Sequence, residues 1–128
     1  MTKIQEDAIR QHGINLLALF PRATERDPIK LCKKLRQLDG KAAALAMRQC
    51  NGPEFASEEA LENQYEAILH QVNGLLGNKS VPVFINRDPR GYQLKIISEY
   101  MQPHIKLHRD WGGYGIIAPE INSKGELR

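Results

Sequence analysis

The feature that most constrains the fold is a change in hydrophobic period at Gly77. Before it, apolar residues recur every three or four positions, the spacing of helices that bury one face. After it, short runs rich in β-branched and aromatic residues alternate with turn formers, as in strands. Helices followed by strands predict an α+β fold. We expect N-terminal helices packed on a small C-terminal antiparallel sheet of three to four strands.

The first two helices have clear ends in the sequence. The first is expected over residues 4–20, with Gly13 as a point where it could break, because glycine weakens a helix interior. Asp27 and Pro28 predict the start of the second, since aspartate caps a helix whose first residue is proline. Its apolar stripe, spaced by threes and fours, continues to about Cys50.

The third helix is expected from Ser57 to Gly77, because Ser57 precedes two glutamates that favour the positive end of the helix dipole. A short connection joins it to the second helix, so we expect the two to form an antiparallel hairpin. The oligomeric state stays open at this stage, because the pair could pack within one chain or exchange between two chains in a homo-oligomer.

Two β-hairpins are expected after Gly77, formed by residues 81–85 with 92–97 and by 105–109 with 114–118. The polar tail from Asn122 is expected to be frayed. No linker or repeat divides the chain. It is therefore expected to be a single domain over 1–128, with a helical part (1–77), a hairpin part (78–121) and a tail (122–128).

Composition excludes several classes of protein. With 41% hydrophobic and 26% charged residues, the chain is globular and not disordered. No apolar run approaches the roughly 20 residues of a membrane span, and the N-terminus lacks a secretory signal. Cys32 and Cys50 are too far apart in the helical register for a disulfide, so two reduced thiols are expected. These points predict a cytoplasmic protein without a membrane partner.

Charge is distributed unevenly along the chain. Residues 1–50 hold ten basic and five acidic residues, whereas residues 51–77 hold five glutamates and no lysine or arginine. The basic second helix could follow a nucleic-acid backbone, or it could be the solvated face of an amphipathic helix. The candidate nucleic-acid residues are Lys30, Lys33, Lys34, Arg36, Lys41 and Arg48.

Charged and aromatic residues are concentrated at the two turns of the predicted hairpins. Such residues on exposed turns often form binding sites, because a rigid sheet holds the loop in place. The candidate binding residues are Arg87, Asp88, Arg90, Tyr92, Arg109, Asp110, Trp111 and Tyr114. The alternative is structural, because Asp88, Pro89 and Gly91 are also the residues that a tight turn requires.

No catalytic set accompanies these turns. An enzyme acting on a phosphate or nucleotide would need Asp88, His108 and Asp110 around one cleft, and the sequence gives them no common geometry. A metal site at His104, His108 and Asp110 is not expected either. In a strand, neighbouring ligands would lie roughly 7 Å apart. The sequence predicts no cofactor and no metal. Of the three function classes considered, an enzyme is the least favoured.

The runs VFINRDPRGYQLKI and DWGGYGIIAPE resemble small orphan proteins of phages, prophages and plasmids, which carry similar N-x-D-P-R-G-Y and R-D-W-G-G-Y-G-I-I-A-P segments. The resemblance covers residues 82–120 and brings no activity or catalytic residue with it. It implies an accessory protein of a mobile element that binds a component of the host or the element. The sequence therefore predicts a cytoplasmic, non-enzymatic binding protein with a protein partner, presenting both turns at one edge of its sheet.

Overall fold

The computed structural model describes residues 2–51, 57–77, 83–88, 92–96, 107–108 and 114–126, with the backbone alone at 51, 107–108 and 114–116. Three helices come first: α1 (Lys3–Leu19), α2 (Pro28–Asn51) and α3 (Glu58–Leu76). The strands follow: β1 (Val83–Ile85), β2 (Leu94–Ile96), β3 (Leu107–His108) and β4 (Tyr114–Ile116). The prediction of an α+β fold with N-terminal helices is confirmed.

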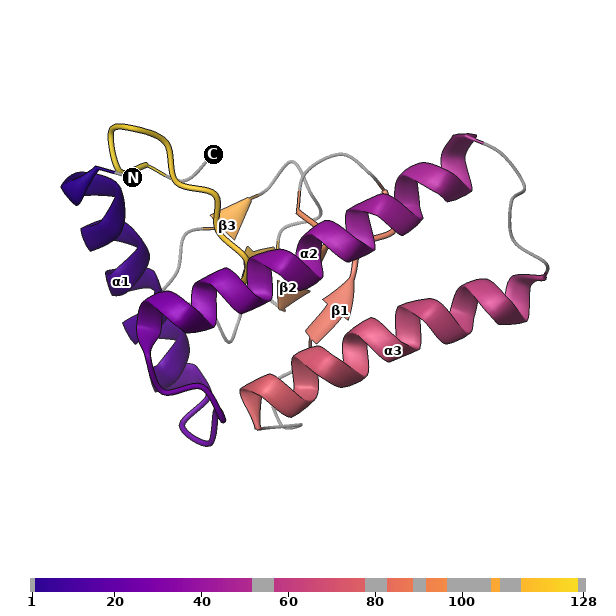
Figure 1. The fold of residues 1–128 in the computed structure, drawn as a ribbon, viewed down its shortest axis with the longest axis horizontal. Coiled ribbons are helices and arrows are strands. Elements are labelled where there is room, and N and C mark those ends of the chain that lie inside the picture. Colours follow the sequence, from indigo (N-terminus) through magenta and orange to yellow (C-terminus); the bar gives the residue numbers. More distant parts are fainter. Residues whose placement is uncertain are drawn as a thin grey trace.

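Figure 1 shows α2 and α3 running antiparallel to each other in front of β1 and β2, with α1 packed across the first turns of α2. The predicted helix hairpin is therefore confirmed. The apolar stripes of both helices point into the shared core. Buried members include Leu31, Leu35, Leu38, Ala42 and Leu45 of α2, and Leu61, Tyr65, Ile68 and Val72 of α3.

Each helix begins at a side chain that accepts a hydrogen bond from an otherwise unpaired backbone N–H. Thr2 and Gln5 form a reciprocal capping box at α1, which sequence reasoning had missed. The predicted caps of the other helices are confirmed: Asp27 accepts from Lys30 N–H at 3.0 Å, and Ser57 accepts from Ala60 N–H at 3.1 Å. These caps set the helix bounds locally.

Gly13 does not break α1, which is continuous from Lys3 to Leu19. Its lack of a side chain serves packing instead. A Cβ at this position would lie 2.3 Å from the carbonyl oxygen of Pro28, so only glycine lets the start of α2 approach α1 so closely. The weakness expected from glycine in a helix is offset by this contact between helices.

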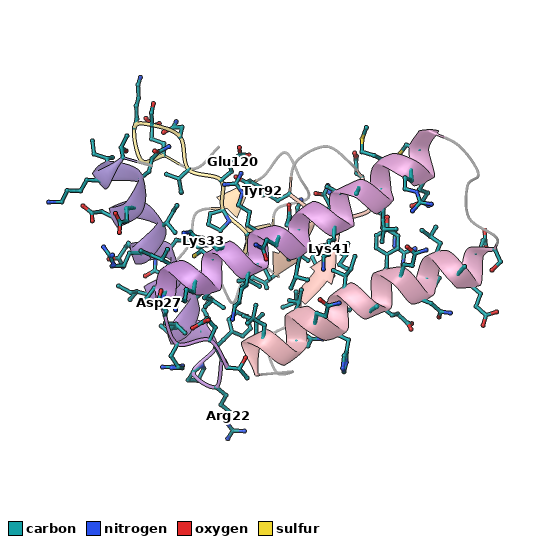
Figure 2. The ribbon with its side chains drawn as sticks, viewed as in Figure 1. Arg22, Asp27, Lys33, Lys41, Tyr92 and Glu120 are labelled. Carbon is teal, nitrogen blue, oxygen red and sulfur yellow. The ribbon has the colours of Figure 1, made fainter. Side chains whose placement is uncertain are left out.

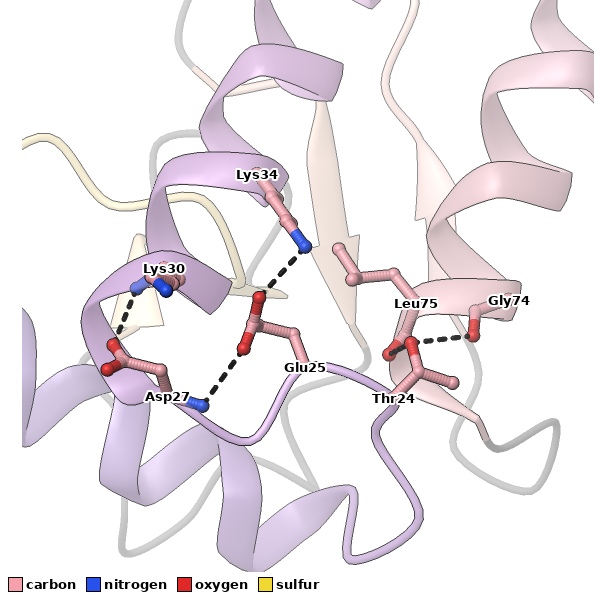
Figure 3. Close-up of polar contacts among 7 residues, drawn as sticks. All are labelled: Thr24, Glu25, Asp27, Lys30, Lys34, Gly74 and Leu75. Atoms are coloured by element: carbon pink, nitrogen blue, oxygen red, sulfur yellow. Dashed lines mark hydrogen bonds and ion pairs between the residues drawn. The ribbon is translucent and has the colours of Figure 1, made fainter.

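The loop between α1 and α2 closes the C-terminal end of α3 (Figure 3). Thr24 donates from its backbone N–H to the Leu75 carbonyl at 2.9 Å, and its hydroxyl reaches the same carbonyl at 3.2 Å. Gly77 ends α3 with φ 64°, as predicted, and a Cβ there would lie 1.9 Å from the Arg22 carbonyl oxygen. The last carbonyls of α3 are thereby satisfied by a segment about 50 residues earlier in the chain.

β1 pairs antiparallel with β2, β2 with β4 and β4 with β3, giving the strand order β1-β2-β4-β3. The two predicted hairpin pairings are therefore confirmed over the described strands. Leu94 and Ile96 of β2 belong to the core beneath the helices. Lys95 between them faces the opposite side of the sheet by the alternation of a strand, and it is 0% exposed.

The prediction of a frayed tail is wrong for residues 122–126. The Asn122 side chain accepts from the backbone N–H groups of Lys124 and Glu126 at 2.9 and 3.0 Å, and these residues form a hydrogen-bonded turn. Gly125 packs against Ile4, so the turn lies beside the start of α1. The hydrogen bonds of the Asn122 side chain and this long-range contact fix the conformation of a segment whose polar composition predicts disorder.

Candidate functional site

The turn residues predicted to bind a partner are only partly described. Arg90, Arg109, Asp110 and Trp111 lie outside the described residues, and Tyr114 is described by its backbone in β4. Arg87, Asp88 and Tyr92, at the β1–β2 connection, have described side chains. Their surroundings test whether this end of the sheet is available for a partner.

The strand pairing separates the two predicted turns. β2 is antiparallel to both β1 and β4. Ile85 and Leu94, which flank the first turn, therefore lie at the end of β2 where Ile117 donates to the Leu94 carbonyl. His108 and Tyr114, which flank the second, lie at the Ile96 end. The expectation that both turns share one edge of the sheet is wrong, because two hairpins paired antiparallel place their connections at opposite ends.

Arg87 is held by α3. Its guanidinium makes a two-point contact with the Glu62 carboxylate, one arm at 2.6 Å, and lies 4.3 Å from the centre of the Tyr65 ring. The hydrogen bonds from Arg87 lower the pKa of the Glu62 carboxyl. A guanidinium stacked on a ring and paired with a carboxylate has both recognition modes occupied within the chain.

Asp88 also serves the turn. Its backbone N–H donates to the Asn86 side chain at 3.1 Å, while its carbonyl accepts from the side chains of Asn86 and Gln93 at 3.3 and 2.9 Å. This Asx-type arrangement fixes the path of the chain leaving β1. The structural alternative considered for this turn is therefore correct for the backbone of Asp88.

Tyr92 is buried and connects β2 to the C-terminal segment. Its hydroxyl accepts from the Glu120 N–H and donates to the Glu120 carbonyl at 3.2 Å. The Glu120 carboxylate in turn pairs with Arg36 of α2 at 3.3 Å. Figure 2 shows Tyr92 and Glu120 next to each other beside α2. Tyr92 therefore holds the C-terminal segment against β2 and is not an exposed binding residue. Arg36 contacts the same segment through Glu120.

Asp39 fixes β2 to α2. One carboxylate oxygen accepts from the backbone N–H groups of both Gln93 and Leu94, each at 2.8 Å. Burial raises the pKa of Asp39, and those two hydrogen bonds oppose the rise. Burial also lowers the pKa of Lys95 on the same strand. These polar contacts set the position of the strand against the helix.

The basic residues of α2 lie on its exposed surface. Lys30, Lys34, Lys41 and Arg48 are spaced by four, seven and seven residues, so they share one side of the helix, here called the basic flank. Lys34 pairs with Glu25 at 2.8 Å, and this contact lowers the pKa of Glu25. Figure 3 shows this pair beside the start of α2.

Towards its C-terminal half, the basic flank borders a groove between α2 and α3 with a volume of about 360 Å³. This α2–α3 groove is lined by Lys41, Ala44, Leu45, Arg48, Gln64, Ala67 and Ile68. Figure 2 shows Lys41 on the side of α2 that faces α3. Of the described residues that line it, two are cationic, four are apolar and none is acidic.

None of the α3 glutamates is among the residues that line this groove. Glu62 pairs with Arg87, and Glu66 lines a neighbouring hollow that shares Ala67 with the groove. Neither Glu62 nor Glu66 is therefore among the residues that line the groove beside the basic flank. The sequence shows the charges of both helices, but not which side of α3 faces α2.

The described residues contain no group of three or more His, Cys, Asp or Glu placed to hold a metal ion. Asp110 and the side chain of His108 lie outside the described residues, so the grouping of Asp88, His108 and Asp110 that an enzyme would need stays a prediction. Both cysteines are free thiols as predicted, and burial raises the pKa of Cys32 to about 12. None of the described helices combines the length and apolar character required to cross a membrane.

Comparison of the sequence and structure with protein-family models, curated proteins and solved structures gives no match. The functional argument therefore depends on the residues themselves. Sequence reasoning identified Lys41 and Arg48 but missed Ala44, Gln64 and Ala67. The signal that could have found them is the pair of alanines on exposed positions of two helices predicted to be antiparallel neighbours.

Proposed function

We propose that this chain is a small, non-enzymatic binding protein that captures an acidic protein surface on the basic flank of α2. The observation that carries the proposal is the α2–α3 groove, where Lys41 and Arg48 border an apolar floor and no described lining residue is acidic. Apolar area with cations at its rim is what a protein interface needs for affinity and for orientation.

The contacts of Arg87 and Tyr92, two turn residues with described side chains, support this choice of surface. Arg87 and Tyr92 stabilise the fold through Glu62, Tyr65 and Glu120. Lys41, by contrast, makes no ion pair within the described part of the chain. The proposal therefore moves the binding surface from the hairpin turns to the helices and assigns the sheet, taken as three to four strands, the role of a scaffold.

The proposed setting follows from the sequence. Reduced cysteines favour the cytoplasm, and the resemblance of residues 82–120 favours an accessory protein of a phage, prophage or plasmid that acts on a component of the host or the element. The partner is accordingly proposed to be a cytoplasmic protein with an acidic face.

Nucleic acid is the second candidate, favoured by the length of the basic flank. From Lys30 to Arg48 it extends about 27 Å at 1.5 Å per residue, enough to follow several phosphates. Against it, α2 contains no aromatic residue on which bases could stack. A nucleic acid would also leave the apolar floor of the groove unused.

Capture from bacterial lysate, with and without nuclease, tests the proposal. The variant Lys41→Glu/Arg48→Glu reverses both groove cations, and Lys33→Glu is a matched control because Lys33 is exposed on α2 and does not line the groove. We expect the double variant to lose acidic partners that the control retains, with nuclease making no difference. Retention of the same proteins by the double variant would refute the proposal, and capture that disappears with nuclease would favour nucleic acid.

A further inference from the structure

We infer that the occupant of the α2–α3 groove is an amphipathic helix of the partner, with an apolar stripe and an acidic flank. This inference rests on the proposed function and specifies the chemistry of its partner. It depends on three properties of the groove: its shape, the size of its lining side chains and the spacing of its charges.

The shape of the groove fits a third helix. Its lining residues come from two antiparallel helices, over residues 41–48 of α2 and 64–68 of α3. Leu45 and Ile68 form an apolar floor, and both belong to the hydrophobic core beneath. A helix inserted there would bury residues at positions i, i+3, i+4 and i+7 against this floor.

Each helix contributes one small, exposed side chain to the lining of the groove. Ala44 on α2 and Ala67 on α3 are both exposed, and both line the groove. Side chains that end at Cβ let a third helix approach closer than leucine or lysine would, and close approach increases the contact area between helices. Exposed alanines elsewhere, such as Ala18 on α1, do not line this groove.

The charges specify the sign of the partner. Lys41 and Arg48 are seven residues apart on α2, which places them two turns, about 10 Å, from each other along the groove. Acidic residues seven apart on a bound helix would meet both. Gln64 on the opposite wall is uncharged and able to donate or accept a hydrogen bond, and no described residue that lines the groove is acidic.

Synthetic peptides provide the probe. The first has about 20 residues, enough to form helix on binding, with a leucine stripe at helical spacing and glutamates seven apart on one flank. The second has the same composition in an order that removes the stripe, and the third carries lysine in place of each glutamate. Fluorescence anisotropy should show the first binding at least about tenfold more tightly than either of the others.

Filling the groove should weaken this binding. In the full chain, Ala67→Leu and Ala44→Leu each place a larger side chain into the groove at an exposed helical site, and leucine keeps helix propensity. Each should reduce affinity for the first peptide by about tenfold. Ala18→Leu, the matched control on α1, should bind as the parent does. Urea unfolding of all three checks that the fold is retained.

Some results would overturn the inference. Equal binding of the first two peptides would show that charge alone is recognised, and unchanged affinity in both groove-filling variants would show that the groove is not used. Tighter binding of a DNA or RNA oligonucleotide than of the acidic peptide would assign the surface to nucleic acid. If the first two peptides bind equally while Lys41→Glu/Arg48→Glu still loses acidic partners, the helix inference fails and the proposed function stands.

Discussion

The β1–β2 end of the sheet and the basic flank of α2 are both rich in cationic side chains, but the fold uses them differently. At the sheet end, Arg87 contacts Glu62 and the Tyr65 ring of α3. On the flank, Lys34 pairs with Glu25, whereas Lys41 is exposed beside the α2–α3 groove and makes no ion pair with a described residue. Positive charge in a sequence therefore does not identify a binding surface until the position of the nearby acids is known.

The two regions should also differ in how much they contribute to the free energy of unfolding. Contacts at the sheet end join segments far apart in the chain, so removing them should lower the free energy of unfolding without changing partner capture. Side chains of the groove rim lie at the surface, where most substitutions alter stability by less than about 0.5 kcal/mol. Substitutions in the two regions should thus have opposite effects on stability and on binding.

The largest effect is expected for Asp39→Ala, on the inner side of α2. It leaves the backbone N–H groups of Gln93 and Leu94 without their acceptor and should reduce the free energy of unfolding by about 3 kcal/mol. Asp39→Asn retains one carbonyl oxygen and should lose less. Urea unfolding measures both, and a change below about 0.5 kcal/mol for the alanine variant would show that the carboxylate does not hold β2.

The second prediction removes one cation from each region. Arg48→Ala should weaken capture of the acidic peptide by about threefold to tenfold with little change in stability, because it removes a charge from the groove rim. Arg87→Ala should lower the unfolding midpoint and leave capture unchanged. Fluorescence anisotropy measures the peptide affinity of both variants, and urea unfolding measures their stability. Weaker capture by Arg87→Ala would return the binding surface to the turn.

Tyr92→Phe should have a smaller effect on stability, about 1 kcal/mol. It removes the hydroxyl that contacts both backbone groups of Glu120 and keeps the buried ring. Thermal or urea unfolding measures the loss, and peptide binding should not change. A variant as stable as the parent would mean that the C-terminal segment is held without this hydroxyl.

The smallest effect concerns pH and the exposed ion pair of Glu62 and Arg87. Arg87 lowers the pKa of Glu62 in the folded chain, so the pair adds stability above the pKa that Glu62 has in the unfolded chain. This contribution is lost as the pH falls through the lowered folded pKa. The stability difference between the parent and Glu62→Gln should therefore be greatest near neutral pH and shrink in acid. A difference independent of pH would exclude the ion pair as its source.

Local features of the sequence predicted much of the fold. Asp27 and Ser57 mark helix starts and Gly77 marks a helix end, because capping involves residues only a few positions apart. The strands of each hairpin pair as predicted. Gly13 was misjudged, because its role depends on the approach of Pro28 from another helix.

The candidate site was less predictable. Lys41 and Arg48 are visible in the sequence as basic residues of an amphipathic helix, but the groove beside them needs Gln64 and Ala67 from α3. The direction in which a neighbouring helix presents its side chains is fixed by packing. No local sequence pattern predicts this direction.

The sequence by itself determined the order of helices and strands, their caps and the sign of charge on each helix, because these depend on neighbouring residues. Only the tertiary structure decided which charges are engaged. The antiparallel pairing of β2 with β4 separated the two turns, and Glu62, 25 residues before Arg87, engaged its guanidinium. Pairing and packing join residues distant in the chain, and their outcome depends on the whole core being assembled at once.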